Sequence, residues 1–159
     1  TENDAERLRA SGAPVRQIVT HGLCHLEAAM VEEHLLGWKV GDVSFLVIEN
    51  VGNLVCPSSY DLGEDLRIVA LSVTEGEDKP AKYPVIFSTA DLVVLTKLDM
   101  AETAEWDREA AHRAIQDVRP GVRTIETSAR TGSGVDELIE AIVARRDAVL
   151  GRVSTSTAR

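Results

Sequence analysis

The sequence predicts an α/β fold, in which helices flank a mostly parallel β-sheet. Short runs of valine, isoleucine and leucine alternate along the chain with amphipathic stretches of helical spacing, the pattern of parallel strands joined by crossover helices. The chain has 159 residues, of which 44% are hydrophobic but only 4% aromatic. This length corresponds to one domain with an aliphatic core, expected over residues 1–150, and residues 151–159 are expected to be a disordered tail.

The first half of the chain contains two predicted helices and two predicted strands. A short helix is expected over residues 3–8, where Asn3 can cap the first turn, and a strand over residues 15–19. A second helix is expected over residues 25–36, which a glycine follows. Residues 43–48 read VSFLVI and are the best candidate for a buried strand, so we expect them at the centre of the sheet.

The second half alternates strands and helices more regularly. Strands are expected over residues 68–73, 92–95 and 123–126. Helices are expected over residues 83–89, 106–117 and from 134 onward. The strand over residues 68–73 is also expected to be central, and residues 74–80 are expected to form a charged loop.

The acidic composition argues against polyanionic partners. The chain has 17 lysine and arginine residues against 26 aspartate and glutamate residues, a net charge of −9. It therefore has no general attraction for nucleic acid or for an anionic membrane surface. No apolar run approaches the roughly 20 residues that span a bilayer, and the polar first residues are no signal peptide, so we expect a cytoplasmic protein.

A polar motif directly follows the predicted strand at residues 92–95. In open parallel sheets, ligands bind beyond the carboxyl ends of the strands. Thr96, Lys97 and Asp99 belong to the sequence TKLD, which looks like the guanine-specificity element Asn/Thr-Lys-x-Asp of GTPases. A carboxylate there can accept hydrogen bonds from two nitrogens of guanine that adenine cannot match, while the lysine stem packs along the base. Taken alone, the motif is equally consistent with a helix-capping aspartate beside a solvated lysine.

A second motif follows the predicted strand at residues 123–126. Ser128 and Ala129 resemble the SA element of GTPases, whose backbone N–H faces the guanine carbonyl. On their own, these two residues are better explained by an ordinary turn before a capped helix. The order and spacing of the TKLD and SA elements together favour guanine binding.

A third strand end, after VSFLVI, carries the sequence ENVGN. An acidic residue such as Glu49 at the tip of a buried strand can hold a Mg²⁺-bound water. A glycine three residues later, here Gly52, lets a backbone N–H approach a γ-phosphate, as in the DxxG switch of GTPases. Glu49 stands where most GTPases have aspartate, and a simple tight turn is the alternative.

Five strings in order identify a family. They are NDAERL at 3–8, GLCHLEA at 22–28, ENVGNLVCP at 49–57, YDLGE at 60–64 and LSVTEGEDKPAKYP at 71–84. Together they resemble HypB, the GTPases that assist nickel insertion during hydrogenase maturation, from Thr1 to about Leu150. The resemblance implies a P-loop GTPase-like fold of the SIMIBI type, GTP or GDP with Mg²⁺ as ligands, and the hydrogenase large subunit and other nickel-maturation proteins as partners. It also places Asp4 in a switch region that contacts Mg²⁺ or phosphate, whereas an acidic residue in a first helical turn is the alternative.

Two cysteines and a histidine carry the metal prediction. Thiolate and imidazole are ligands that suit Ni²⁺ and Zn²⁺. From spacing alone, Cys24, His25 and Cys56 supply one ligand too few for a tetrahedral structural site, and two buried thiols with a surface histidine are the simpler explanation. The HypB resemblance implies that these three residues form the metal site of the GTPase domain, at the interface of a homodimer. Because Cys56 closely follows ENVGN, we hypothesise that the nucleotide state moves Cys56 and thereby changes metal affinity.

The 159 residues contain no GxxxxGKS or GxxxxGKT motif, the loop whose backbone N–H groups hold the phosphates of GTP. In the HypB family this P-loop lies upstream of the NDA string, together with the first strand and the first helix. We therefore expect an N-terminally truncated member that lacks these parts, or one half of a split protein. The 159-residue chain is expected to show no GTP hydrolysis, and turnover above background from the pure chain would contradict this expectation.

Two functions remain open at this point. The chain is the guanine-specificity and metal-site portion of a GTP-dependent nickel-insertion protein, or it is a nucleotide-independent nickel- or zinc-binding module or an inactive fragment. The TKLD and SA elements favour the first function, and the missing phosphate loop favours the second. His34 and His112 are expected to be surface or core histidines. His21 is a weaker candidate for a metal ligand than Cys24, His25 and Cys56.

Overall fold

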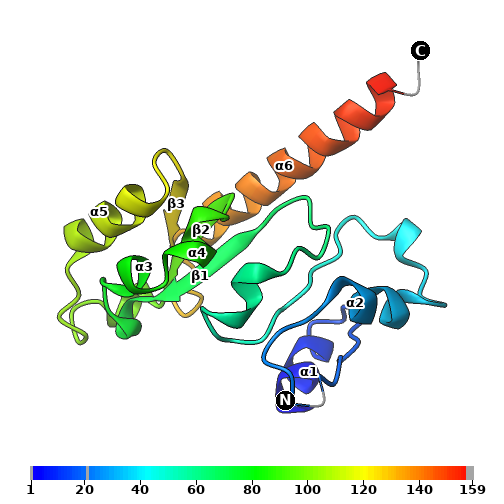
Figure 1. The fold of residues 1–159 in the computed structure, drawn as a ribbon, viewed down its shortest axis with the longest axis horizontal. Helices are drawn as coiled ribbons and strands as arrows, with labels where there is room; N and C mark the ends of the chain where they lie inside the picture. The colour runs from blue at the N-terminus through cyan, green and yellow to red at the C-terminus, as the bar shows by residue number, and fades with distance from the viewer. Residues whose placement is uncertain (1, 21, 157–159) are drawn as a thin grey trace. The chain divides into compact units, whose positions relative to one another are not determined.

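The computed structural model of the protein describes residues 2–20 and 22–156, with only the backbone described for 2–4 and 152–156. The chain divides into two compact units, Thr1–Gly63 and Glu64–Arg159 (Figure 1). The helices are α1 (Glu2–Arg9), α2 (Ala28–Leu35), α3 (Lys79–Lys82), α4 (Pro84–Ser88), α5 (Arg108–Val118) and α6 (Val135–Ser156). The strands are β1 (Ile68–Ser72), β2 (Leu92–Thr96) and β3 (Arg123–Glu126). Short 3-10 turns are η1 (Val40–Asp42), η2 (Cys56–Ser59), η3 (Val73–Glu75) and η4 (Leu98–Met100).

The second unit is built on a parallel sheet with the strand order β1-β2-β3. In its register Ile68 pairs with Leu92, and Leu92 pairs with Arg123. The central strand β2 is buried along Leu92–Leu95, because its run of aliphatic residues faces packed helices on both sides. These observations confirm the predicted α/β fold with a parallel sheet, but β1 lies at an edge of the described sheet and not at its centre.

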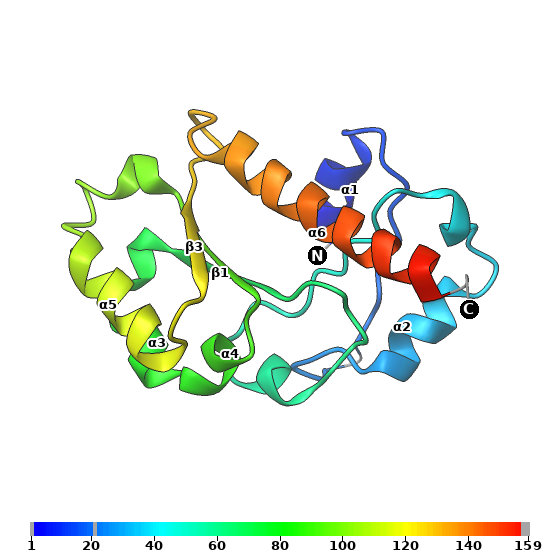
Figure 2. The same ribbon diagram turned by 90° about the horizontal axis from the view of Figure 1, so that it is seen from above.

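Helices cover both faces of this sheet. Figure 2 shows α3, α4 and α5 on one side of the sheet and α6 on the other. On the α6 side, Leu138 and Ala141 pack against a buried cluster of Leu92, Val94 and Ile125. Helix α5 begins with a true cap, since the side chain of Asp107 accepts a hydrogen bond from the Ala110 N–H at 2.9 Å.

Two predictions for the second unit need correction. Helix α6 continues to Ser156, although the polar composition of 151–159 predicts a disordered tail from residue 151. Residues 79–82 form the short helix α3 instead of ending a charged loop, because Pro80 lies in the first turn of the helix, where proline is tolerated. Residues 157–159 lie outside the described residues.

The first unit consists of two short helices joined by extended segments and turns. Among the described residues its buried apolar side chains are few, namely Ala5, Leu26, Val31 and Pro57. The guanidinium of Arg16 donates to the carbonyl oxygen of Leu36 at 3.2 Å, just beyond the end of α2, and lies 5.1 Å above the ring of Trp38. Polar contacts of this kind, rather than a large core, hold the unit together.

The predicted strands over residues 15–19 and 43–48 do not form within the described part of the first unit. Residues 43–48 have no strand assignment, and Val47 is 85% exposed. The apolar pattern of VSFLVI predicts a strand, but a strand forms only where a neighbouring strand accepts and donates backbone hydrogen bonds. The prediction of a buried central strand here is therefore wrong for this structure.

No helix within residues 2–20 and 22–156 is long and apolar enough to cross a membrane.

Candidate functional site

The predicted guanine-specificity residues lie at the carboxyl ends of two paired strands. Thr96 is the last residue of β2, and Lys97 leads into the turn η4, which contains Asp99. Ser128 and Ala129 follow β3, the neighbour of β2. Parallel pairing brings the two segments to the same edge of the sheet, where ligands bind in open α/β folds.

Hydrogen bonds join these two segments directly. The hydroxyl of Ser128 donates to Oδ1 of Asp99 at 2.5 Å. Behind this pair, the Thr127 N–H donates to the Leu95 carbonyl at 2.7 Å, and the Leu98 N–H donates to the Thr127 carbonyl at 3.0 Å. The structure therefore brings together the two motifs that the sequence predicts as one guanine site, although their role in binding guanine stays a prediction.

Asp99 and Ala129 are exposed, whereas Ser128 is 1% exposed. The Asp99 carboxylate accepts no second side-chain or backbone hydrogen bond within the described residues. Its second oxygen is thus available to a ligand, and Ser128 holds the first one in place. The buried hydroxyl of Ser128 thus positions the exposed carboxylate of Asp99.

The loop after β3 is closed by short backbone hydrogen bonds and by a glycine. The Ser128 N–H donates to the Ser133 carbonyl at 2.9 Å, and the Gly132 N–H donates to the Ser128 carbonyl at 2.8 Å. Gly134 has a φ of +69°, and a Cβ there would stand 3.0 Å from the carbonyl carbon of Glu126 and closer still to its oxygen. Only glycine fits this position, which starts α6 against the end of β3.

Lys97 adopts the left-handed conformation, with φ 59° and ψ 39°. Few residues other than glycine and asparagine enter this region, because Cβ approaches the carbonyl oxygen. The side chain of Lys97 is exposed. A strained backbone at a predicted ligand-contacting lysine agrees with a functional role for that side chain.

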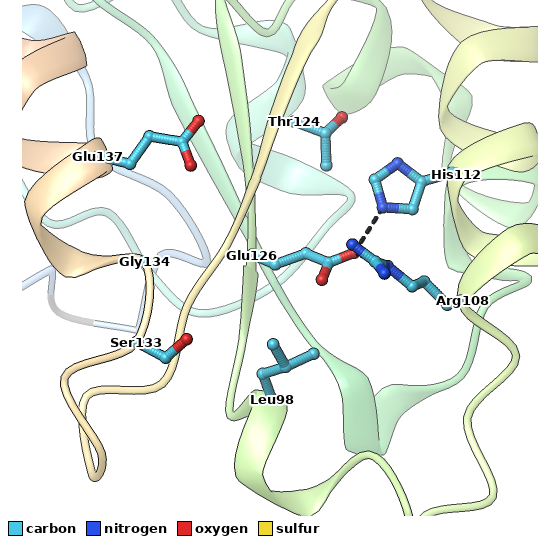
Figure 3. Close-up of a pocket in the computed structure, with 8 residues that line it drawn as sticks. All are labelled: Leu98, Arg108, His112, Thr124, Glu126, Ser133, Gly134 and Glu137. Atoms are coloured by element: carbon cyan, nitrogen blue, oxygen red, sulfur yellow. Dashed lines mark hydrogen bonds and ion pairs between the residues drawn. The ribbon is translucent and has the colours of Figure 1, made fainter.

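A polar cavity of about 350 Å³ lies beside these loops (Figure 3). Its lining residues are Leu98, Arg108, His112, Thr124, Glu126, Ser133, Gly134 and Glu137. Figure 3 shows Arg108 and His112 reaching toward Glu126 from α5, with Glu137 of α6 on the other side of β3. Sequence reasoning missed this cavity, because its lining residues come from η4, α5, β3, α6 and the loop before α6 and form no motif.

Glu126 is the electrostatic centre of the cavity. Its Oε1 accepts from Arg108 Nε at 2.6 Å and lies 2.7 Å from His112 Nε2. Burial raises the pKa of the Glu126 carboxyl, but the hydrogen bonds from His112 and Arg108 and their charges outweigh this effect and leave the pKa below its ordinary value. His112 is therefore a hydrogen-bond partner of Glu126. The buried hydroxyl oxygen of Thr124 has no partner within the described residues.

The first unit brings together the predicted metal-site residues. Cys24 and Cys56 form a disulfide, with 5.9 Å between their Cα atoms. The Nδ1 atom of His25 lies 3.8 Å from the sulfur of Cys24. Two sulfurs and one imidazole from segments 32 residues apart therefore meet at one point, as the sequence predicts, but the two sulfurs bond to each other in this structure.

The imidazole of His25 is held on two sides. Its Nε2 lies 3.3 Å from Oε1 of Glu27, and the ring of Tyr60 stacks on it with 3.8 Å between centroids and an 11° interplanar angle. His25 is 8% exposed. These contacts fix the plane of the ring, and a hydrogen bond from Nε2–H to Glu27 leaves Nδ1, on the Cys24 side, as the acceptor nitrogen.

Within the described residues, no three histidine, cysteine, aspartate or glutamate side chains are arranged as ligands of one metal ion. The disulfide accounts for this, because a sulfur in a disulfide is a poor metal ligand and the thiolate is a good one. The residue types fit Ni²⁺ or Zn²⁺, and the metal role of Cys24, His25 and Cys56 stays a prediction.

Glu49 and Gly52, predicted to act in GTP hydrolysis, are both exposed. Gly52 has no positive φ, and a Cβ there would meet nothing within 4 Å. The fold itself therefore does not require glycine at this position. Asp4 lies in α1, but its side chain is outside the described atoms, and His21 is outside the described residues.

Comparisons with known proteins give a consistent result. The sequence model of the family described as CobW/HypB/UreG, nucleotide-binding domain, matches residues 1–126. A hydrogenase maturation factor HypB from Azotobacter chroococcum mcd 1 is 45% identical over 150 residues, which are 94% of this chain and 49% of that protein. HypB from Escherichia coli K12 is 43% identical over 146 residues, or 92% of this chain and 50% of that protein. The chain thus spans about half the length of these curated relatives.

Two solved structures share the fold. A crystal structure of HypB from Archaeoglobus fulgidus is 40% identical and has a TM-score of 0.84, covering 92% of this chain and 71% of the solved one. A crystal structure of HypB from Helicobacter pylori in complex with nickel is 38% identical, with a TM-score of 0.87, 92% of this chain covered and 70% of the solved one. From the family match and these two structures, the chain belongs to the HypB family of CobW/HypB/UreG nucleotide-binding proteins.

Proposed function

We propose that this chain takes part in GTP-dependent nickel insertion into hydrogenase, supplying the nickel ligands and the guanine-specific contacts. The observation that carries the proposal is the convergence of Cys24, Cys56 and His25 Nδ1 in the first unit. Relatives named hydrogenase maturation factors, and one HypB solved with nickel, support it. Nickel is here the cargo that the protein receives and passes on.

Nickel binding requires the reduced form of the cysteine pair. Two molecules of a thiol reductant such as glutathione convert the Cys24–Cys56 disulfide into two thiols and are themselves oxidised to one disulfide, and each cysteine thiol loses its proton when it binds the metal. Ni²⁺ then takes two thiolates and the imidazole of His25, which leaves its coordination shell open. An open shell suits a protein that must release the ion, whereas a closed shell suits a structural site.

A second copy of the chain would share this shell, so that separation of the two copies reopens it. One chain offers three ligands of these types, and Cys24 is exposed at the surface of its unit. We therefore infer a homodimer whose interface contains the metal site, with the hydrogenase large subunit and other nickel-maturation proteins as the recipients of nickel. Zn²⁺ is the competing ion for the same ligands.

The guanine contacts are assigned to the edge formed by β2 and β3. Asp99 accepts from the base, Ser128 positions Asp99, and the stem of Lys97 packs along the ring, while Thr96 and Ala129 flank the base. The contacts support guanine over adenine because a carboxylate pairs with the two N–H donors of guanine.

The phosphate end of the nucleotide is assigned to Glu49, Gly52 and Asp4. Mg²⁺ with GTP would be contacted there, and the fold gives no steric reason for the glycine, which is consistent with a ligand contact at Gly52. Because Cys56 lies close after this turn, the nucleotide state would alter nickel affinity. Equal nickel affinity with GDP and with a GTP analogue, in a protein that has the phosphate loop, would contradict this coupling.

The metal part of the proposal is tested by titrating the reduced chain with Ni²⁺ and recording the thiolate-to-nickel absorption. His25→Ala should abolish most of the binding. His34→Ala is the matched control, because His34 contacts the Met30 carbonyl at 2.8 Å and not the cysteines. Binding that is equal in His25→Ala and in the parent chain would refute the assignment.

The nucleotide part is tested with Asp99→Asn, which keeps the shape of the side chain but replaces one acceptor oxygen by a donor. Discrimination between guanine and adenine nucleotides should fall by about tenfold or more, since an N–H of guanine then lacks its partner. If the parent chain binds nickel but shows no guanine preference, the nucleotide-independent metal module becomes the better description.

A further inference from the structure

Asn53 connects the two segments that carry the cysteines. Its Nδ2 donates to the carbonyl oxygen of Cys24 at 2.7 Å. Its Oδ1 accepts from the Cys56 N–H at 2.9 Å and from the Val55 N–H at 3.0 Å. The side-chain amide of Asn53 is therefore hydrogen-bonded to the backbone of both cysteines, which lie 32 residues apart in the sequence.

A second asparagine in the same turn holds the neighbouring histidine segment. Oδ1 of Asn50 accepts from the Leu26 N–H at 3.0 Å and from the Val51 N–H at 2.8 Å. Leu26 directly follows His25, so both asparagines of the ENVGN turn are hydrogen-bonded to the segment 24–26, which contains the predicted ligands Cys24 and His25. Asn53 differs from Asn50 in that it contacts both cysteine residues.

We propose that Asn53 is a positioning residue for nickel: it holds Cys24 and Cys56 at the separation that one metal ion, or one disulfide, requires. This inference rests on the proposed function. Asn53 is not a ligand, because all three of its contacts go to backbone atoms. Without Asn53, Asn50 and the stacking of Tyr60 on His25 still join the two loops, but the hydrogen bonds that link the backbones of Cys24 and Cys56 are lost, so each sulfur must be ordered at the moment of binding.

We call the three hydrogen bonds of the Asn53 side chain the Asn53 clamp. Two variants separate its bond to Cys24 from its bonds to Val55 and Cys56. Asn53→Ala removes all three hydrogen bonds. Asn53→Asp keeps an acceptor for the N–H groups of Val55 and Cys56 but loses the donor, and sets a carboxylate oxygen against the Cys24 carbonyl. Aspartate should therefore preserve the loop of Cys56 and free the loop of Cys24.

The first measurement needs no metal. The reduced chain is equilibrated with oxidised and reduced glutathione, so that two protein thiols and one glutathione disulfide give the protein disulfide and two glutathione thiols. The position of this equilibrium reports how closely the two sulfurs are held. Asn53→Ala should shift it about tenfold toward the reduced protein.

The second measurement is Ni²⁺ affinity of the reduced chain. Loss of a positioning residue typically weakens metal binding 10–100-fold, so we expect about this loss in Asn53→Ala and a comparable one in Asn53→Asp. Gln116→Ala is the matched control in the other unit, where the Gln116 carboxamide also bridges backbone groups, donating to Val122 O at 2.9 Å and accepting from Gly121 N at 2.8 Å. It should lower the thermal stability of the chain without changing nickel affinity or the glutathione equilibrium.

The outcomes distinguish the inference from the proposed function. A parent chain that binds no Ni²⁺ refutes the nickel function, while the glutathione equilibrium still tests the clamp. A parent chain that binds Ni²⁺, with unchanged affinity and unchanged thiol equilibrium in Asn53→Ala, overturns the inference alone. If Asn53→Ala does not fold, the Ni²⁺ affinity of Asn53→Asp tests the inference instead. An affinity equal to that of the parent chain would show that the contact to Cys24 has no positioning role.

Discussion

Replacing Gly134 by alanine should destabilise the second unit through two separate effects. The residue has a φ of +69°, and its Cβ would run into the backbone of Glu126 at the end of β3. A left-handed conformation costs an L-residue about 1–2 kcal/mol. The collision forces the backbone to shift, and overpacking of this kind adds about 1–3 kcal/mol. We therefore expect a total loss of about 2–5 kcal/mol.

Gly132 provides the matched control. Its φ is +82°, but a Cβ there would meet nothing within 4 Å. Gly132→Ala should accordingly lose only the conformational part, about 1–2 kcal/mol. The difference between the two variants isolates the collision with Glu126.

Urea unfolding followed by tryptophan fluorescence measures both losses. The chain has two tryptophans, Trp38 in the first unit and Trp106 in the second. In a Trp38→Phe background, the half-buried Trp106 reports on the second unit alone. The midpoint should fall further for Gly134→Ala than for Gly132→Ala, with an unchanged slope. Equal losses in the two variants would refute the steric reasoning.

Two further predictions concern the exposed apolar segment and the charged cavity. Val47→Lys should slow aggregation, measured by light scattering, because Val47 is 85% exposed and lies in a run in which the apolar residues Val43, Phe45 and Leu46 are also exposed. Val55→Lys, at a residue outside this run that is 59% exposed, should change the aggregation rate less, and an equal effect would point to net charge alone. The third prediction concerns pH, because the pKa of Glu126 is lower in the folded protein than in the unfolded chain. The charged carboxylate therefore stabilises the folded protein at any pH above the unfolded-state pKa. This contribution disappears as the pH falls through the folded-state pKa. Because Arg108 is largely exposed, the contribution is no more than about 1 kcal/mol, and Glu126→Gln should flatten the decline of the urea midpoint on acidification. A decline that is as steep in Glu126→Gln as in the parent chain would assign it to other carboxyl groups.

The parts that the sequence predicted correctly depend on local pattern. Strand β2 is a continuous run of aliphatic residues, which is typical of a strand buried on both faces, and it forms at the predicted place. The TKLD and SA elements were expected at one site because consecutive parallel strands end at one edge, and the hydrogen bond from Ser128 to Asp99 joins them.

The parts that the sequence did not predict depend on contacts between distant segments. Residues 43–48 are rich in aliphatic residues like β2, but the described sheet consists of β1, β2 and β3 and does not include them. The cavity around Glu126 forms where η4, α5, β3 and α6 approach one another, and no sequence periodicity records such an approach. The bonds of Asn53 likewise depend on a loop closure that spacing alone does not specify.

The 32-residue separation between Cys24 and Cys56 also has a thermodynamic consequence for the first unit. A cross-link that closes a loop of this length restricts the unfolded chain and stabilises the folded one by about 3–4 kcal/mol. The first unit has few buried apolar side chains with which to replace that contribution once the cross-link is reduced. Under the proposed function, bound nickel then links the two cysteines in place of the disulfide. The free energy of nickel binding therefore contributes directly to the folding of this unit.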